Sequence, residues 1–215
     1  PYKDASDALQ AGDSEAIRKA IWNASPYQPD GIVDGKSLLE LVTNPSPPCD
    51  FEYPFAGLQR LTHGCRYGEL TVISAGTGQG KSTLTRQLAT HFLDKDERVG
   101  YIALEESNRR TALGLMSVAT GKALHLGEHS KETLQEAYDY TLKNWNLFLY
   151  DHFGSADPDT IYSRIEYMAL ALETKTIFLD HLSILISGLD GDERKMIDTT
   201  MTKLRSLVAV SYTHL

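Results

Sequence analysis

The chain has 215 residues, 41% of them hydrophobic, and a formal net charge of −8 with a pI near 5.3. This length suits one α/β domain with an appendage, and the acidic balance argues against a free-standing module that binds nucleic acid through an overall basic surface. Cys49 and Cys65 have neither metal-ligand nor disulfide-framework spacing, which indicates packing residues in a reducing compartment. No apolar run approaches the ~20 residues of a membrane span and no signal-peptide pattern is present, so we expect a soluble intracellular protein without a membrane partner.

The amino-terminal part predicts one short helix and a linker. Asp13 or Ser14 can cap a helix over residues 13–24, whose apolar residues recur on one side. Six prolines then cluster within residues 25–56 around an apolar patch at residues 38–42. This composition is typical of a linker, which either carries a small docking helix or acts as a solvated spacer.

From residue 57 onward, predicted strands and helices alternate, as a parallel sheet with crossover helices requires. We expect strands at residues 70–74, 99–104, 147–150 and 176–179, and helices at residues 81–93, 108–120, 131–143 and 159–173. Glu105, Asp151 and Asp180 follow three of these strands directly. The carboxyl ends of the strands are where open α/β sheets bind ligands.

Residues 75–82 read Ala-Gly-Thr-Gly-Gln-Gly-Lys-Ser between a predicted strand and a predicted helix, which is the context of a phosphate-binding loop. In such a loop Lys81 bridges the β- and γ-phosphates and Ser82 holds magnesium. Ala75 replaces the first glycine of the pattern, which is tolerable if its φ stays negative. A glycine-rich turn that binds nothing is disfavoured by the order of strand and helix. The predicted nucleotide-binding set is Ala75, Gly76, Thr77, Gly78, Gln79, Gly80, Lys81, Ser82 and Thr83.

Acidic residues at two other strand ends complete a candidate hydrolytic site. Asp180 ends a buried-strand pattern about a hundred residues after Lys81 and is placed to orient magnesium. Hydrolysis also needs a carboxylate that polarises water beside the γ-phosphate. Glu105 directly follows its strand and is the better candidate, whereas Glu106 can cap the helix that follows.

Two histidines and a basic helix have simpler explanations. His63 is best explained as a loop or packing residue. His181 lies beside Asp180 in the sequence, close enough to act around the metal site. Four basic residues on a predicted amphipathic helix form a solvated face by default, Arg194, Lys195, Lys203 and Arg205.

Several collinear motifs over roughly residues 50–208 resemble the phage primase-helicases and the mitochondrial helicase Twinkle, within the RecA-like ATPases. The resemblance rests on the entry at residues 57–70 and on residues 74–83, 104–107, 179–184 and 192–198. It implies a RecA-like P-loop NTPase core with a parallel sheet flanked by helices, preceded by a short helical linker. It also implies a replicative DNA helicase that hydrolyses ATP or dTTP with magnesium and moves 5'-to-3' on single-stranded DNA. Lys81 and Ser82 would then hold phosphate and metal, Glu105 would be the catalytic carboxylate and Asp180 the Walker B acid.

The same resemblance predicts how the chain is organised and what it meets. We expect residues 1–24 to end a Toprim primase domain, 25–56 to form the linker and 57–210 to form an incomplete ATPase domain. Residues 211–215 resemble translated sequencing-adapter read-through, so we expect a foreign tail, and the family's sensor histidine and arginine finger cannot be assigned. The implied partners are single-stranded DNA, further copies in a hexameric ring, a primase domain in cis and a replication polymerase. The implied location is bacterial cytoplasm, phage-infected or not, rather than the mitochondrion.

Three other readings remain open at this stage. A RecA- or RadA-type recombinase shares the core, although the Leu-Glu-Glu-Ser and Asp-His-Leu-Ser motifs favour a helicase. A small-molecule kinase is weaker, because no arginine-rich lid segment is present. A nucleotide-binding assembly fragment without turnover belongs to a different class.

Overall fold

The computed structural model describes residues 2–24, 32–45, 48–151, 157–187 and 192–215, and it divides into two compact units, Pro1–Pro47 and Pro48–Leu215. The first unit contains α1 (Ala5–Gln10), α2 (Ser14–Trp22), the 3-10 helix η1 (Gly35–Leu38) and α3 (Leu39–Thr43). Helix α2 confirms the predicted helix, and Asp13 caps it by accepting a hydrogen bond from the backbone N–H of Ala16 at 3.0 Å. Helix α1 has no counterpart in the sequence prediction. The helical turns of η1 and α3 agree with a helix in the linker, whereas its docking stays a prediction.

The second unit alternates helices and strands. Its elements are α4 (Ala56–Thr62), α5 (Lys81–Leu93), β1 (Val99–Ala103), α6 (Asn108–Thr120), α7 (Lys131–Tyr140), β2 (Leu147–Leu149), α8 (Pro158–Leu170), β3 (Thr176–Asp180), α9 (Leu182–Ser187) and α10 (Glu193–Ser211). Helices α7 and α8 end three residues before their predicted ends, and other bounds agree within a residue or two. None of the helices in the described ranges is long and apolar enough to cross a membrane.

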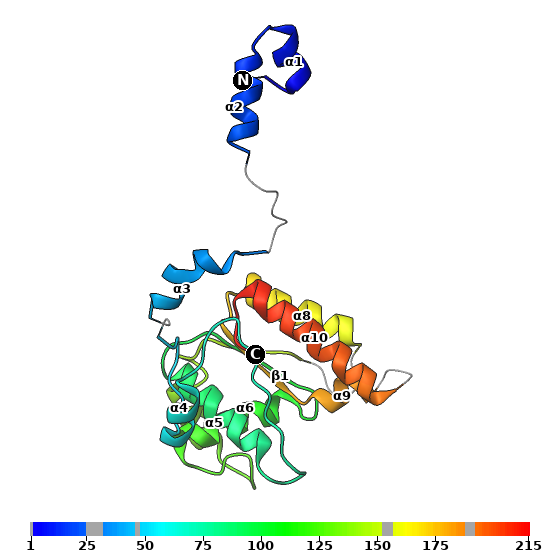
Figure 1. Ribbon diagram of the computed structural model, residues 1–215. Helices are drawn as coiled ribbons and strands as arrows, with labels where there is room; N and C mark the ends of the chain where they lie inside the picture. The colour runs from blue at the N-terminus through cyan, green and yellow to red at the C-terminus, as the bar shows by residue number, and fades with distance from the viewer. Residues whose placement is uncertain (1, 25–31, 46–47, 152–156, 188–191) are drawn as a thin grey trace. The chain divides into compact units, whose positions relative to one another are not determined.

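The strands form a parallel sheet in the order β2-β1-β3. Val99 pairs with Leu147 on one side and with Thr176 on the other, and Ala103 pairs with Asp180. Helices α5 and α6 lie on one side of the sheet and α8 and α10 on the other (Figure 1). The predicted α/β class, with a parallel sheet flanked by helices, is therefore confirmed.

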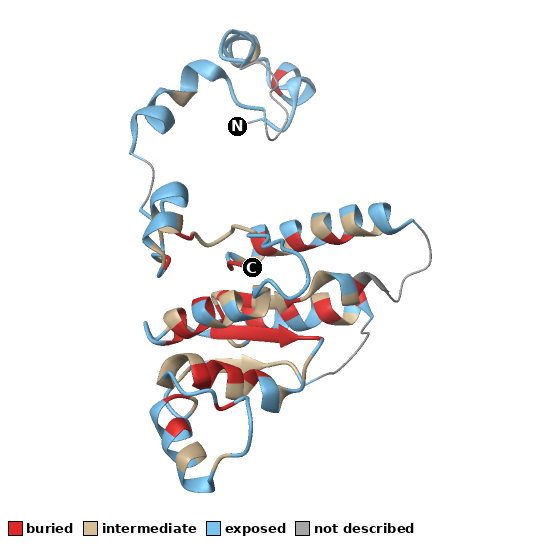
Figure 2. Cartoon of the chain, turned by 90° about the horizontal axis from the view of Figure 1, so that it is seen from below, coloured by how far each residue is buried: buried red, intermediate tan, exposed pale blue. Residues whose placement is uncertain are grey.

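Strand β1 is buried along its whole length because it faces a helical layer on each side (Figure 2). Side chains alternate along a strand, so Tyr101 packs with Phe92 of α5 while Ile102 packs with Ile165 of α8. The two layers thus form two separate apolar clusters. This arrangement fixes the carboxyl end of β1, where Glu105 follows, between α5 and α8.

The predicted strand at residues 70–74 is wrong, because the structure forms no strand there. Thr71 donates its backbone N–H to the carbonyl of Leu215 at 2.8 Å, and Leu215 donates to the carbonyl of Glu69 at 3.2 Å. His214 in turn bridges to Thr176 at the start of β3. The carboxyl-terminal residues therefore lie between segment 70–74 and β3, and they are too few to provide the ladder of hydrogen bonds that a strand requires.

Candidate functional site

The phosphate-loop residues form a tight turn that leads into α5. Gly78 and Gly80 adopt left-handed φ values of 75° and 85°, which glycine tolerates at no steric cost. Ala75 is absent from the non-glycine residues with positive φ in the described ranges, so its replacement of glycine needs no strained backbone. Lys81 Nζ donates to the carbonyl oxygens of Ala75 at 2.8 Å and Gly76 at 3.2 Å. The lysine ammonium thus lies over the loop, at the amino-terminal end of a 13-residue helix.

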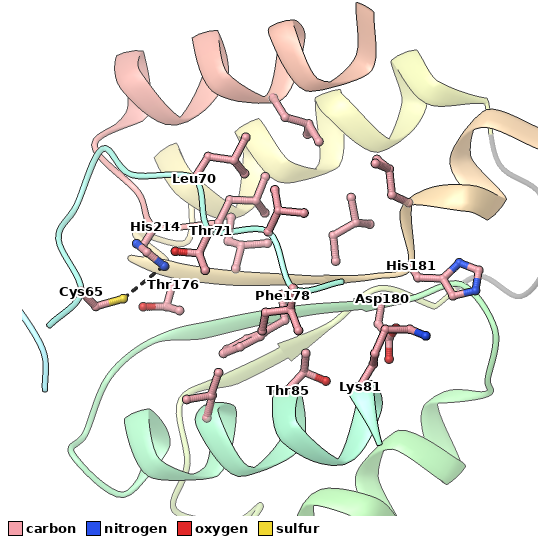
Figure 3. A pocket seen from close by; sticks show the side chains of 18 of the residues that line it. Cys65, Leu70, Thr71, Lys81, Thr85, Thr176, Phe178, Asp180, His181 and His214 are labelled. Atoms are coloured by element: carbon pink, nitrogen blue, oxygen red, sulfur yellow. Dashed lines mark hydrogen bonds between the residues drawn. The ribbon is translucent and has the colours of Figure 1, made fainter. Parts of the chain in front are cut away.

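The strand ends bring three predicted site residues together. Ser82, Glu105 and Asp180 line one pocket, although they are far apart in the sequence. Lys81 and Asp180 also line a neighbouring apolar pocket, where both side chains lie close to His181 (Figure 3). The parallel sheet explains this arrangement, because β1 and β3 end at the same edge.

Asp180 is the most enclosed acidic side chain of the site, with 9% of its surface exposed. No hydrogen bond or ion pair reaches its carboxylate from the residues that the structure describes, and a buried carboxylate without a partner is unfavourable. A magnesium ion fits this position, since it prefers oxygen ligands and usually takes only one or two from the protein beside phosphate and water. The described residues contain no cluster of three or more His, Cys, Asp or Glu side chains suited to a metal, which agrees with such a sparse ligand set.

Glu105 makes a contact that the sequence did not predict. His181 Nε2 lies 2.6 Å from Glu105 Oε1, and because the carboxylate accepts, the imidazole nitrogen is the donor. Half of the Glu105 side chain, 52%, stays exposed. The other ring nitrogen of His181 is buried and has no hydrogen-bond partner among the described residues. The expectation that His181 acts around the metal site therefore stays a prediction, now with Glu105 as its partner.

Glu106 does not cap the following helix. Ser107 is the N-cap of α6 and accepts from the backbone N–H of Arg110. Glu106 instead faces Arg86 of α5, whose Nη2 lies 2.7 and 2.6 Å from the two carboxylate oxygens. The capping interpretation is wrong because this buried cation competes successfully for the carboxylate. Of the two adjacent acids, only Glu105 is left open to the pocket.

The remaining histidine and cysteine predictions concern packing. His63 ends α4 as its C-cap with φ 57°, as expected for a loop residue. Cys65 is buried, and its Sγ lies 3.1 Å from His214 Nε2 and 3.4 Å from the Tyr53 hydroxyl. Burial raises the pKa of Cys65 to about 11, so the thiol stays protonated. The packing role predicted for Cys65 is confirmed.

His214 lies at the opposite end of β3 from Asp180 (Figure 3). Its Nδ1 donates to the carbonyl of Arg66 at 3.0 Å, and burial lowers its pKa. It therefore does not face the pocket of Ser82 and Glu105. The foreign origin of residues 211–215 stays a prediction, which sequencing the gene across this point tests.

Two contacts of the site could not be found in the sequence. Arg86 and Glu106 are 20 residues apart, and Glu105 and His181 are 76 apart. Neither pair carries a motif of its own, because each depends on the order of strands in the sheet. The only sequence signal was the position of all four residues beside recognised motifs.

Comparison with known families agrees with this geometry. The model of the DnaB-like helicase C-terminal domain matches residues 51–209. The chain therefore belongs to the family of DnaB-like helicase C-terminal domains.

Individual relatives and a solved structure add detail. The DNA helicase/primase of Enterobacteria phage T3 is 36% identical over 217 residues, which cover 95% of this chain and 38% of that protein. The replicative DNA helicase DnaB of Helicobacter pylori strain 26695 is 28% identical over 212 residues, covering 88% of this chain and 41% of the relative. The solved structure of a helicase ATPase domain superposes with a TM-score of 0.62 at 16% identity, over 98% of this chain and 70% of that one. The fold is thus RecA-like, and the chain spans less than half the length of these curated relatives.

Proposed function

We propose that this chain is the ATPase core of a replicative DNA helicase, which hydrolyses a nucleoside triphosphate to move 5'-to-3' on single-stranded DNA and unwind duplex. The observation that carries the proposal is the meeting of Ser82, Glu105 and Asp180 in one pocket beside the phosphate loop. Membership of the helicase family supports it. The names of the T3 and H. pylori relatives support a role in replication.

Each residue has a distinct chemical role in this proposal. The backbone N–H groups of residues 75–83 and the amino-terminal end of α5 cradle the phosphates, and Lys81 adds a cation to the outer two. The Ser82 hydroxyl and the Asp180 carboxylate hold magnesium, which supplies charge neutralisation at the phosphates when bound. Glu105 accepts a proton from the attacking water, for which an exposed carboxylate at the edge of the pocket is suited.

The finer details of the proposal come from the family resemblance. The nucleotide is ATP or dTTP with magnesium, and the active form is a ring, with six subunits the expected number. A primase domain in cis and a replication polymerase are the proposed protein partners, and the cytoplasm of a bacterium or phage-infected bacterium is the proposed location. The primase partner is supported by the name of the phage T3 relative, a DNA helicase/primase.

Two alternatives remain to be separated by experiment. A RecA- or RadA-type recombinase would use the same fold, and an assembly fragment would bind nucleotide without turnover. The test is hydrolysis with and without single-stranded DNA, measured on the 215-residue chain and on an extended chain. In the extended chain, residues 1–210 continue into the matching carboxyl-terminal segment of the phage T3 relative. DNA-stimulated hydrolysis by the extended chain supports the proposal, and nucleotide binding without hydrolysis in both forms contradicts it.

A further inference from the structure

Glu106 and Arg86 form the most enclosed ion pair among the described residues, with 13% of each side chain exposed. One guanidinium nitrogen, Nη2, faces both carboxylate oxygens. Thr111 adds a hydroxyl hydrogen bond to Glu106 Oε1 at 2.9 Å, and Arg110 Nε lies 3.6 Å from Oε2. The carboxylate is thus held from two helices at once, α5 and α6, and its orientation is determined by several partners.

The position of this pair links the two halves of the proposed site. Arg86 follows Ser82 by four residues on α5, so both side chains lie on one face of the helix. Glu106 is the next residue after Glu105. Ser82, Arg86, Glu105 and Glu106 all line the same pocket. The ion pair therefore joins the helix that begins at the phosphate loop to the segment that carries the proposed water-activating carboxylate.

Gly114 shows that helix α6 leaves room for Arg86. A Cβ at Gly114 would lie 2.6 Å from Arg86 Nε and 2.7 Å from Arg86 Cζ, closer than real Cβ contacts allow. Glycine is unfavourable inside a helix, so its place in the middle of α6 needs a packing reason. The guanidinium supplies that reason.

We propose that Arg86 and Glu106 are positioning residues for hydrolysis, which set the distance of Glu105 from the phosphates without contacting nucleotide themselves. This inference rests on the proposed function, because it requires Glu105 to activate water. An ion pair that served only stability would act equally well elsewhere in the fold. Arg98 and Glu173 form such a pair at 2.6 Å, exposed at the amino-terminal ends of β1 and β3, and they provide a matched control.

The test compares Arg86→Ala, Arg86→Lys and Gly114→Ala with the control Arg98→Ala, in the 215-residue chain and in the extended chain. Three quantities are measured: the thermal unfolding midpoint, the dissociation constant of a fluorescent nucleoside triphosphate, and the single-turnover hydrolysis rate. We expect Arg86→Ala to slow hydrolysis about tenfold to a hundredfold, because a small misplacement of a catalytic group is enough for such a loss. Nucleotide affinity should change less than about twofold, since the cation does not reach the phosphates.

Gly114→Ala should slow hydrolysis in the same way, because the added methyl group displaces the guanidinium while leaving its charge in place. Arg86→Lys should recover part of the rate, and Arg98→Ala should leave both rate and affinity unchanged. The inference is overturned if Arg86→Ala and Gly114→Ala hydrolyse at the wild-type rate while folded, or if Arg98→Ala slows hydrolysis as much. If the wild-type protein fails to hydrolyse in both forms, the proposed function itself is contradicted, so the two failures are distinguishable.

Discussion

The adjacent residues Glu105 and Glu106 have opposite surroundings. Glu105 is half exposed and contacts one histidine, whereas Glu106 is enclosed and held by Arg86 and Thr111. Exposure at the pocket suits a group that must meet water, and enclosure suits one that fixes a backbone. The Glu-Glu sequence alone left both acids as candidates.

This difference predicts the ranking of two conservative substitutions in the extended chain. Glu105→Gln should retain triphosphate binding but slow hydrolysis by roughly a hundredfold or more, because the amide keeps the shape and loses the basic carboxylate. Glu106→Gln keeps hydrogen-bonding capacity toward Arg86 and Thr111 and should slow hydrolysis less than about tenfold. Single-turnover rates check both values, and a reversed order would transfer the catalytic role to Glu106.

Lys81 has the most direct prediction at this scale. Lys81→Ala should weaken triphosphate binding roughly tenfold to a hundredfold, the range for losing hydrogen bonds to a charged group, and should abolish hydrolysis. The reason is that Lys81 is the cation of the loop itself, with its ammonium already over the Ala75 and Gly76 carbonyls. Titration of the variant with fluorescent triphosphate provides the measurement. Near-normal affinity would show that phosphate is bound elsewhere.

At the scale of elements, most of the fold could be predicted from local patterns. Helices α5 and α6 begin and end where the sequence predicted, because Gly80 and Ser107 mark their starts and Gly121 follows the end of α6. The strand expected at residues 70–74 fails for a non-local reason. A strand exists only with a partner, and the partner of this segment is limited to the last residues of the chain.

The close approach of β1 and α8 predicts the effect of filling Gly100. An added Cβ would lie 2.9 Å from Met168 Sδ and 3.3 Å from Ile177 Cγ1 and Thr174 Cγ2. Gly100→Ala should therefore lower the free energy of unfolding by about 1–3 kcal/mol, as overpacking of a core does.

Gly57→Ala is the matched control for that experiment. Gly57 lies in α4 and has nothing within 4 Å of a built Cβ, so alanine should raise stability by about 0.5–1 kcal/mol. Denaturant unfolding of both variants measures the two changes. A Gly100→Ala protein as stable as wild type would mean that β1 and α8 pack less closely than described.

At the scale of the whole molecule, the pocket between residues 70–73 and β3 is the main departure from a closed core. It is lined largely by apolar side chains, among them Leu70, Val72, Phe92, Ile177, Phe178 and Leu204. Leu215 enters one end, and the other end reaches Lys81 and Asp180. An incompletely filled sheet of this kind exposes backbone groups that can pair with another chain.

The 215-residue chain should accordingly bind nucleotide weakly and show little DNA-stimulated turnover. The family resemblance supplies the second reason, since an arginine finger from a neighbouring subunit is worth on the order of a thousandfold in related chemistry. Hydrolysis assays with and without single-stranded DNA, together with sedimentation to detect aggregation and rings, compare the chain with its extended form. Equal DNA-stimulated rates in the two forms would show that residues 1–215 already hold a complete site.

Unwinding of a forked duplex by the extended chain is the most direct test of helicase function, with Lys81→Ala as the inactive control. Substrates that carry a single-stranded tail at either the 5' or the 3' end separate direction from simple melting. We expect strand separation that depends on hydrolysable triphosphate and on a free 5' tail. Hydrolysis without unwinding, accompanied by exchange of strands between homologous duplexes, would contradict the helicase assignment and identify a recombinase instead.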